Sequence, residues 1–351
     1  MKSRKGLVLL ALGLILAAIV YLNRGRIHFD WAVFWLQLRH IFWPHIVAGV
    51  ALIYATYWLR SARWAVFLSA TKKVSPFALV GPQFIGFTAV ALIGRLADIT
   101  RPALVAKKVG LPVSSQLAVY TIERMFDLGA AALIFSSALL FVPRDLPHHE
   151  VFVHTGLFSL AGTAAIAIFA VVLRVAGEGV ARIAHGMLHP LSASIADSVA
   201  TKIRGFRDGL NAISSAQDFV VTALISLAMW ALIGMAYVET LHAFVETPQL
   251  ATIPFSRTML LMAASIGGSL LQLPIIGWFT QIAVTAAAMN AFYGAPIEAA
   301  TACGALLLFV TFLSIIPAGL IAARLNHVSL RQTAAEAEAV EATTASDAST
   351  N

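Results

Sequence analysis

Long apolar runs separated by short polar connections form the main pattern of this chain. A helix needs about 20 apolar residues to cross a hydrocarbon core of about 30 Å, and the pattern predicts six such helices. We therefore expect an all-α, polytopic integral membrane protein. The six predicted spans lie near residues 6–22, 44–68, 115–142, 151–173, 219–245 and 297–323.

Two further apolar stretches are interrupted by glycine and proline. Residues 81–109 contain Gly94, and residues 258–292 contain Pro274 and Gly277. Irregular backbone is tolerated at membrane depth where it is buried in protein or lines a cavity. We therefore predict a broken or re-entrant helical hairpin from each stretch.

The two hairpins occupy corresponding positions in two halves of opposite orientation, about 1–146 and 147–325. Paired interrupted segments of this kind indicate an inverted-repeat architecture with a binding site at the interface of the repeats. We predict one membrane domain over residues 1–325. Residues 326–351 are small and acidic without a core-forming pattern, so we expect them to form a disordered cytoplasmic tail.

Composition supports a membrane protein and fixes its predicted orientation. Of 351 residues, 59% are hydrophobic and 12% are charged, whereas a soluble domain carries roughly 25% charged residues. The net charge of +7 does not indicate nucleic acid, because no soluble basic domain is present. Eighteen Lys and Arg residues, Arg60 and Arg63 among them, lie on the proposed inside and five on the outside, which predicts that both termini are cytoplasmic.

The first 25 residues have a basic start followed by an apolar run, which also fits a cleaved signal peptide. Ile19, Val20, Tyr21 and Leu22 stand where a cleavage site would need small residues. We therefore favour a retained first helix.

The stretch from Leu92 to Asp127 places six charged residues among the apolar runs. Ionisable groups within a membrane are rare and usually face the protein interior or a water-filled cavity. Their formal charges sum to zero, so they can pair with one another, and the loss of one would leave its partner uncompensated. The six are Arg95, Asp98, Arg101, Glu123, Arg124 and Asp127.

The spacing of these residues favours contact between them. Arg95, Asp98 and Arg101 recur at steps of three and would share one side of a helix, while Glu123 and Asp127 are four apart. The planar fork of arginine matches phosphate oxygens, so these arginines suit a lipid phosphate at a cytoplasmic cavity. A salt-bridge network that only holds the first hairpin against the third helix explains the same residues equally well, and both can hold.

Three short motifs follow one another along the first half: RSARW (Arg60 to Trp64), RLADITR (Arg95 to Arg101) and ERMFD (Glu123 to Asp127). In this order and spacing they resemble the transmembrane region of the lysylphosphatidylglycerol synthase and flippase family. The resemblance spans residues 1–325. It implies a lipid-translocating domain in which a charged motif of the first half and a Pro/Gly motif of the second half build a central cavity.

The chain departs from the family pattern at two places. The usual Gly-Glu of the first motif is Ala97-Asp98 here, a conservative change. The usual Pro-Gly-Gly run followed by glutamate is replaced by LPIIGWFTQ, with Pro274, Gly277 and Gln281. These three residues would form the gate opposite the arginines, and the missing acid argues against proton coupling there. The sequence carries no soluble synthase domain, so we expect no aminoacylation of lipid.

Other polar clusters are weaker candidates, and we expect neither a metal nor a cofactor. The group His148, His149, Glu150 and His154 fits no zinc signature. The pair His185 and His189 has no third ligand. No P-loop, dinucleotide fingerprint or nucleophile elbow is present in the sequence.

Together, these observations predict a non-enzymatic flippase. The resemblance implies that it lies in the bacterial cytoplasmic (inner) membrane. Its membrane lipid substrate would be anionic or phosphate-bearing, of phospholipid, polyprenyl-linked or hopanoid type as the resemblance implies. The arginines would bind the headgroup, and the carboxylates would orient the arginines and could also exchange protons. Two alternatives are a membrane enzyme acting on a lipid phosphate, and a non-transporting partner of a lipid-modifying or glycosyltransferase enzyme. A homo-oligomer also stays open, because small-residue contacts within and between subunits look alike in sequence.

Overall fold

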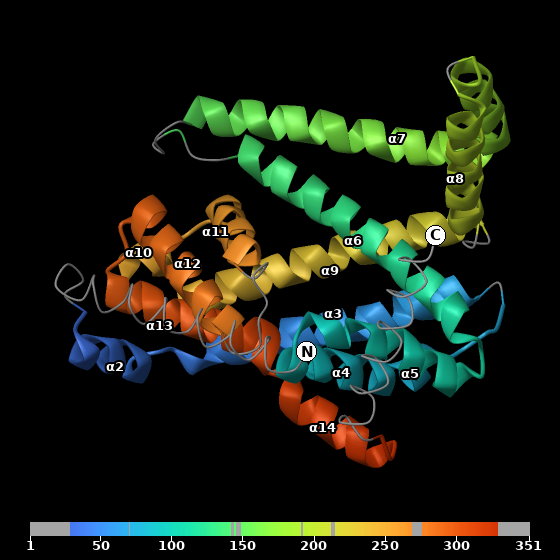
Figure 1. Cartoon of the computed structure of the whole chain (residues 1–351). Coiled ribbons are helices and arrows are strands. Elements are labelled where there is room, and N and C mark those ends of the chain that lie inside the picture. The colour runs from blue at the N-terminus through green and yellow to red at the C-terminus, as the bar shows by residue number, and fades with distance from the viewer. Residues whose placement is uncertain are drawn as a thin grey trace, which may run out of the picture.

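A computed structural model describes residues 29–69, 71–141, 144, 149–190, 192–211, 215–268 and 276–328, and every regular element within them is helical (Figure 1). The predicted all-α class is confirmed. The elements are α2 (Trp31–Arg39), α3 (Trp43–Leu68), α4 (Pro76–Ile93), η1 (Arg95–Ile99), α5 (Thr100–Val109), α6 (Val113–Leu140), α7 (His149–Leu188), α8 (Ala193–Asn211), α9 (Ala216–His242), α10 (Pro248–Ala251), α11 (Phe255–Gly268), α12 (Ile276–Tyr293), α13 (Ile297–Leu308), η2 (Phe309–Leu313) and α14 (Ile315–Leu325).

Local chemistry determines where several of these helices begin and end. The Asp30 carboxylate accepts hydrogen bonds from the backbone N–H groups of Ala32 (2.8 Å) and Val33 (3.2 Å) and caps α2. Gly110 ends α5 in a left-handed conformation with φ +68°. Gly94, with φ +98°, separates α4 from η1. Glycine adopts this φ without steric cost, so the first hairpin can bend here.

Membrane-spanning helices are evident from length and composition. Within the described residues, four segments are long and apolar enough to cross a membrane: α4, the start of α7 (His149–Phe169), α9 and the continuous run Ile297–Leu325. The number is five if α2 and α3, which meet at a 77° bend, form one span. The chain is thus a multi-pass membrane protein. Although α6 has 28 residues, it is not among these apolar segments. It carries the charged residues Glu123, Arg124 and Asp127.

The helices agree with most predicted spans to within a few residues. The predicted spans 44–68, 115–142, 219–245 and 297–323 correspond to α3, α6, α9 and α13 to α14. The predicted span 6–22 lies outside the described residues. The helix that corresponds to the predicted span 151–173 is longer than predicted. This helix, α7, runs for 40 residues and has non-helical backbone at Ala176. Beyond the apolar run it continues as an amphipathic segment packed against α8.

Both interrupted stretches form pairs of helices. The first begins earlier than predicted, at Pro76, so that α4 alone has 18 residues and is long enough to span a membrane. In the second, α11 has 14 residues and packs against α12, and the connection between them lies outside the described residues.

The predicted halves are joined along α3 and α9, which pack side by side (Figure 1). A Cβ atom at Gly49 of α3 would lie 3.4 Å from the Ala236 carbonyl oxygen of α9. Small residues allow such close helix approach in membranes, where lipid offers no hydrophobic driving force for association. Each of these helices is followed by one of the helix pairs. The inverted relation of the halves remains a prediction.

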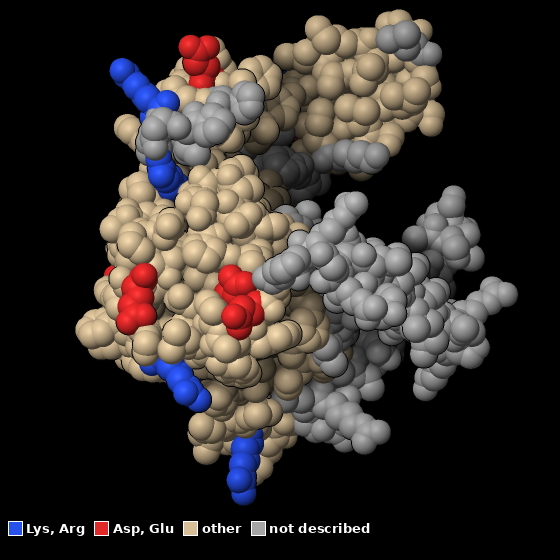
Figure 2. All heavy atoms as spheres, turned by 90° about the vertical axis from the view of Figure 1, so that its left-hand side faces the viewer, with Lys and Arg blue, Asp and Glu red and all other residues tan. Residues whose placement is uncertain are grey.

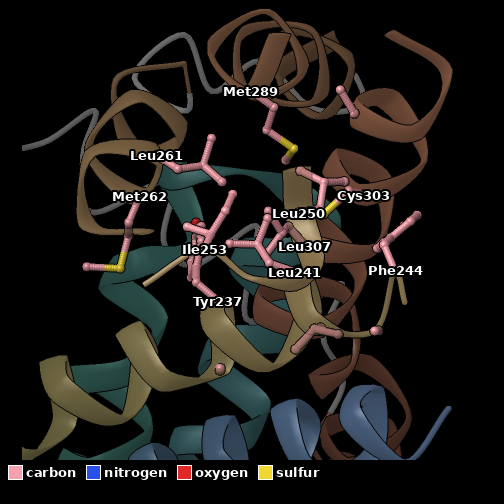
Figure 3. Close-up of a cluster of buried hydrophobic side chains, with 14 of the residues drawn as sticks. Tyr237, Leu241, Phe244, Leu250, Ile253, Leu261, Met262, Met289, Cys303 and Leu307 are labelled. Atoms are coloured by element: carbon pink, nitrogen blue, oxygen red, sulfur yellow. The ribbon is translucent and has the colours of Figure 1, made fainter. Parts of the chain in front are cut away.

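The largest hydrophobic core lies among α3 and the helices from α9 to α13. Figure 3 shows Tyr237 and Leu241 of α9 pointing toward Leu261 of α11, with Met289 of α12 nearby. A smaller core joins α3, α5 and α6 around Trp64. Charged side chains of the same helices gather beside this smaller core.

The outer surface is mostly apolar. Figure 2 shows one end of the molecule, where few side chains of Lys, Arg, Asp and Glu interrupt a surface of other residues. On α7, Phe158 is 85% exposed, and Ile166 and Val175 are also exposed. Since α7 packs only on α6 and α8 among the main helix contacts, most of its apolar surface is available to lipid.

Candidate functional site

Four arginines and three carboxylates meet where α3, η1, α5 and α6 converge. On α3, Arg60 and Arg63 are three residues apart, so both project from one side of the helix, and both are buried. On α6, Glu123 and Asp127 are one turn apart and are also buried. The spacing on each helix therefore places the two arginines of α3 opposite the two carboxylates of α6.

Glu123 is the centre of this cluster, with a side chain that is 1% exposed. Its Oε1 atom accepts hydrogen bonds from Nη2 of Arg63 (2.8 Å) and Nη1 of Arg101 (3.1 Å). Nη1 of Arg60 and Nη2 of Arg124 lie 3.5 and 3.6 Å from the same oxygen. One carboxylate therefore contacts arginines from three helices.

Asp127 forms the second anionic point. Its Oδ1 atom accepts a hydrogen bond from Nη1 of Arg63 at 2.7 Å, and its Oδ2 atom accepts one from Nη1 of Arg60 at 3.2 Å. Nη1 of Arg63 also donates to the Ser226 hydroxyl on α9 at 2.6 Å. The cluster thus connects the first half of the chain to α9 of the second half.

Arg101 is fully buried among aromatic rings. Its guanidinium carbon lies 5.6 Å from the ring centroid of Trp64, 4.6 Å from that of Phe87 and 5.2 Å from that of Tyr120. Cation–π attraction of this kind stabilises a desolvated cation. The Gln83 side-chain oxygen accepts a further hydrogen bond from Arg101 at 3.3 Å.

Asp98 and Arg124 lie at the more accessible edge of the cluster. Asp98 is 24% exposed, accepts a hydrogen bond from the Tyr120 hydroxyl and lies 3.5 Å from Nη2 of Arg101. Arg124 is 36% exposed and lies 3.1 Å from Oδ2 of Asp127. A ligand that approaches from this side meets Arg124 first.

The charges in this cluster do not cancel. Four arginines against three carboxylates leave a formal charge of +1 among the described side chains. Several buried atoms also form no hydrogen bond: Nε of Arg63, Nε and Nη2 of Arg101 and of Arg124, and Oε2 of Glu123. Of these, Nη2 of Arg101 and of Arg124 still lie 3.5 and 3.1 Å from carboxylate oxygens of Asp98 and Asp127. Buried polar groups are nearly always hydrogen-bonded, so the cluster is suited to accept an anion or ordered water.

The structure brings together five of the six charged residues singled out in the sequence. Arg95 lies in η1, but its side chain is outside the described part of the chain. The spacing of three residues does not continue along one α-helix, because residues 95–99 form a 3₁₀-helix and α5 starts at Thr100. Asp98 therefore reaches Tyr120 and Arg101 from a tighter turn than expected.

Of the three residues predicted to form the opposing gate, the structure describes Gly277 and Gln281. Pro274 lies outside the described residues. Gly277 is buried in the first turn of α12. The Gln281 side-chain amide donates a hydrogen bond to the Ser265 hydroxyl on α11 at 3.1 Å. Gln281 thus connects the two helices of the second hairpin, and its role as a gate remains a prediction.

Sequence reasoning missed two central members of the cluster, Arg60 and Arg63. It counted them among the cytoplasmic basic residues of the positive-inside rule, although both fall inside a predicted span. Two arginines three residues apart within an apolar run were the available signal. Their inclusion changes the expected neutral network into one with an excess positive charge.

Comparison with known proteins gives one result that covers most of the chain. No curated protein and no solved structure matches it. The family model described as the lysylphosphatidylglycerol synthase TM region matches residues 8–320. This match confirms the resemblance seen in the three motifs, and the chain belongs to the family of the lysylphosphatidylglycerol synthase transmembrane region.

Proposed function

We propose that this protein moves an anionic or phosphate-bearing lipid between the leaflets of the membrane, as a flippase. The observation that carries the proposal is the buried cluster with four arginines, three carboxylates and guanidinium donors that form no hydrogen bond. Bidentate arginine donors match phosphate oxygens in geometry and charge. Membership of a lipid-associated membrane family supports the same class of substrate.

In the proposed mechanism, Arg124 meets the headgroup first because it is the most exposed arginine of the cluster. The Nε and Nη2 donors of Arg101, which form no hydrogen bond in the structure, then replace part of the water around the phosphate. Glu123 and Asp127 hold the arginines in place, since each carboxylate contacts several of them. Rocking of the two halves along α3 and α9 would expose the site to the opposite side.

The carboxylates favour binding over catalysis. Glu123 and Asp127 are buried and paired with arginines, so neither resembles an acid or base poised for proton transfer. We propose that the chain is not an enzyme. Formation of a modified lipid by the purified protein in detergent, where no second compartment exists, would contradict this.

We also propose that the protein lies in the bacterial inner membrane, as its family membership suggests. The distribution of basic residues supports a cytoplasmic location of both termini. In this orientation α6 starts on the cytoplasmic side.

Substitution of Arg124 tests the proposed transport. In proteoliposomes with fluorescent phosphatidylglycerol, Arg124→Gln should slow translocation at least about tenfold, because a charged hydrogen bond to phosphate contributes about 1.5–3 kcal/mol. The matched control is Arg324→Gln, which alters an exposed arginine at the end of α14. Equal rates for wild type and Arg124→Gln, with both proteins folded, would refute the proposal.

A further inference from the structure

Arg101 is completely enclosed, although the proposed mechanism requires a phosphate to reach it. Its side chain is 0% exposed, and the ring centroids of Trp64, Phe87 and Tyr120 lie 4.6–5.6 Å from its guanidinium carbon. The base of the side chain packs tightly against Gly86 of α4, so the arginine has little freedom to swing outward. One of the groups around Arg101 must therefore move before a ligand can bind.

Two of the three rings are fixed by the protein interior. Trp64 is buried, and its indole N–H donates a hydrogen bond to the Gln116 side-chain oxygen at 2.9 Å. Phe87 packs against the buried ring of Tyr57, with the two ring centroids 4.9 Å apart. Movement of either ring would disrupt close-packed interior, which is costly.

Tyr120 differs from these rings because it lies at the accessible edge of the cluster. Its ring centroid is 5.2 Å from the guanidinium carbons of both the buried Arg101 and the more accessible Arg124. Its hydroxyl donates a hydrogen bond to the partly exposed Asp98, which lies 3.5 Å from Nη2 of Arg101. Tyr120 and Asp98 therefore cover Arg101 on the side from which Arg124 is reached.

Both covering residues can move without disruption of a long helix. Asp98 belongs to η1, a five-residue 3₁₀-helix that follows Gly94 and precedes α5. Hydrogen bonds of a 3₁₀-helix have poorer geometry than those of an α-helix, and such segments often mark hinges. The Tyr120 ring turns about its side-chain torsions while α6 stays in place. A small shift of η1 together with this rotation is enough to uncover Arg101.

We propose that Tyr120 and Asp98 form a lid that controls the access of an anionic headgroup to Arg101. The proposal rests on the proposed function and adds the regulation of the same site. In the closed state, Asp98 stands beside Nη2 of Arg101 but forms no hydrogen bond with it. A phosphate oxygen that takes this place at hydrogen-bond distance binds the arginine better than the carboxylate does, so the anion favours the open lid.

The test measures how often Arg101 becomes accessible in the full chain in detergent micelles. Phenylglyoxal reacts with exposed guanidinium groups, and mass spectrometry under single-hit conditions gives a rate for each arginine. Tyr120→Phe keeps the ring and removes the hydrogen bond to Asp98. Arg101 should then react at least about tenfold faster than in wild type, the effect expected for a lost hydrogen bond to a charged group. Arg63, equally buried but on α3, should stay protected.

Tyr293→Phe is the matched control. It removes a tyrosine hydrogen bond to the backbone oxygen of Arg257, between α12 and α11, and it should leave the rate at Arg101 unchanged. Dihexanoyl phosphatidate, a short-chain phospholipid with a terminal phosphate, provides a second measurement. It should protect Arg101 at a lower concentration in Tyr120→Phe than in wild type, because the lid then opens without loss of a hydrogen bond.

Asp98→Ala removes the other partner of the bond and repeats the test if Tyr120→Phe fails to fold. An unchanged rate at Arg101 in the folded variant, or a rate in wild type that already equals the rate at Arg124, would overturn the lid. Equal protective concentrations in wild type and variant would also overturn it.

This measurement involves no second compartment, so its outcome is separate from transport. Faster modification of Arg101 in Tyr120→Phe, together with unchanged transport in Arg124→Gln, would refute the proposed function alone. Slower transport in Arg124→Gln, together with unchanged modification of Arg101 in Tyr120→Phe, would refute the lid alone.

Discussion

At the scale of single residues, Glu123 has the strongest influence on the arrangement of charge. Arginines from α3, α5 and α6 all lie within 3.6 Å of one of its oxygens. A buried ion pair adds little stability over an apolar pair of similar shape, but removal of one partner leaves an uncompensated charge. Loss of Glu123 would leave four arginines facing only Asp98 and Asp127.

We therefore predict that Glu123→Gln destabilises the protein by about 3–5 kcal/mol. The measurement is reversible unfolding in mixed micelles, followed by tryptophan fluorescence. Glu178→Gln serves as the control, because Glu178 is 43% exposed and pairs with Arg204 across α7 and α8. This control should change stability little, since exposed ion pairs are screened by solvent.

A double variant makes the same prediction sharper. Adding Arg101→Gln to Glu123→Gln removes one of the unbalanced cations, so part of the lost stability should return. If Glu123→Gln unfolds like wild type, the cluster does not hold the fold and serves ligand binding alone.

At the scale of elements, the first hairpin depends on close packing of α4 against α5. A Cβ atom at Gly86 of α4 would lie 2.4 Å from Cγ and 3.2 Å from Cα of Arg101. These atoms belong to the rigid base of the arginine and its backbone, so they cannot move aside easily. Gly86 therefore sets the position of Arg101 beneath its aromatic rings.

Gly86→Ala should separate α4 from α5 and destabilise the protein by about 1–3 kcal/mol, as overpacking usually does. It should also slow lipid translocation, because Arg101 would be displaced. Gly129→Ala in α6 is the control, since no atom lies within 4 Å of a Cβ there. In a helix this exchange is neutral or stabilising, and equal unfolding midpoints for the two variants would contradict the packing argument.

At the scale of the whole molecule, the halves meet along α3 and α9, and the cluster bridges them through Arg63 and Ser226. An extensive apolar core packs the helices from α9 to α13 together (Figure 3). A charged cluster in which several buried atoms form no hydrogen bond is compatible with relative movement of the two halves along α3 and α9.

The orientation of the whole chain in the membrane can be tested by labelling from outside the cell. In intact cells, a membrane-impermeant maleimide should label Arg144→Cys, on the proposed outside, and should not label Ser346→Cys in the tail. The native Cys303 is buried, so it should give no background. Labelling of Ser346→Cys before the cells are opened would show that the tail is outside and reverse the topology.

The members of the site differ in how far the sequence predicted them. Asp98, Arg101, Glu123, Arg124 and Asp127 stood out because charges are rare within apolar runs, and they do converge. Arg60 and Arg63 carried the same signal, but a count of basic residues treated them as surface charges. Ser226 and Gln83 carried no such signal, since uncharged polar residues are common in membrane helices.

The sequence by itself determined the all-helical membrane class, most helix boundaries and five of the seven charged residues of the site, because hydropathy and charge are local properties that act on each segment separately. Tertiary structure alone decided which charges meet and that arginines outnumber carboxylates in the described cluster. These features depend on which faces of α3, α5, α6 and α9 are turned toward one another. That choice is made by packing among residues far apart in the chain, and no local pattern records it.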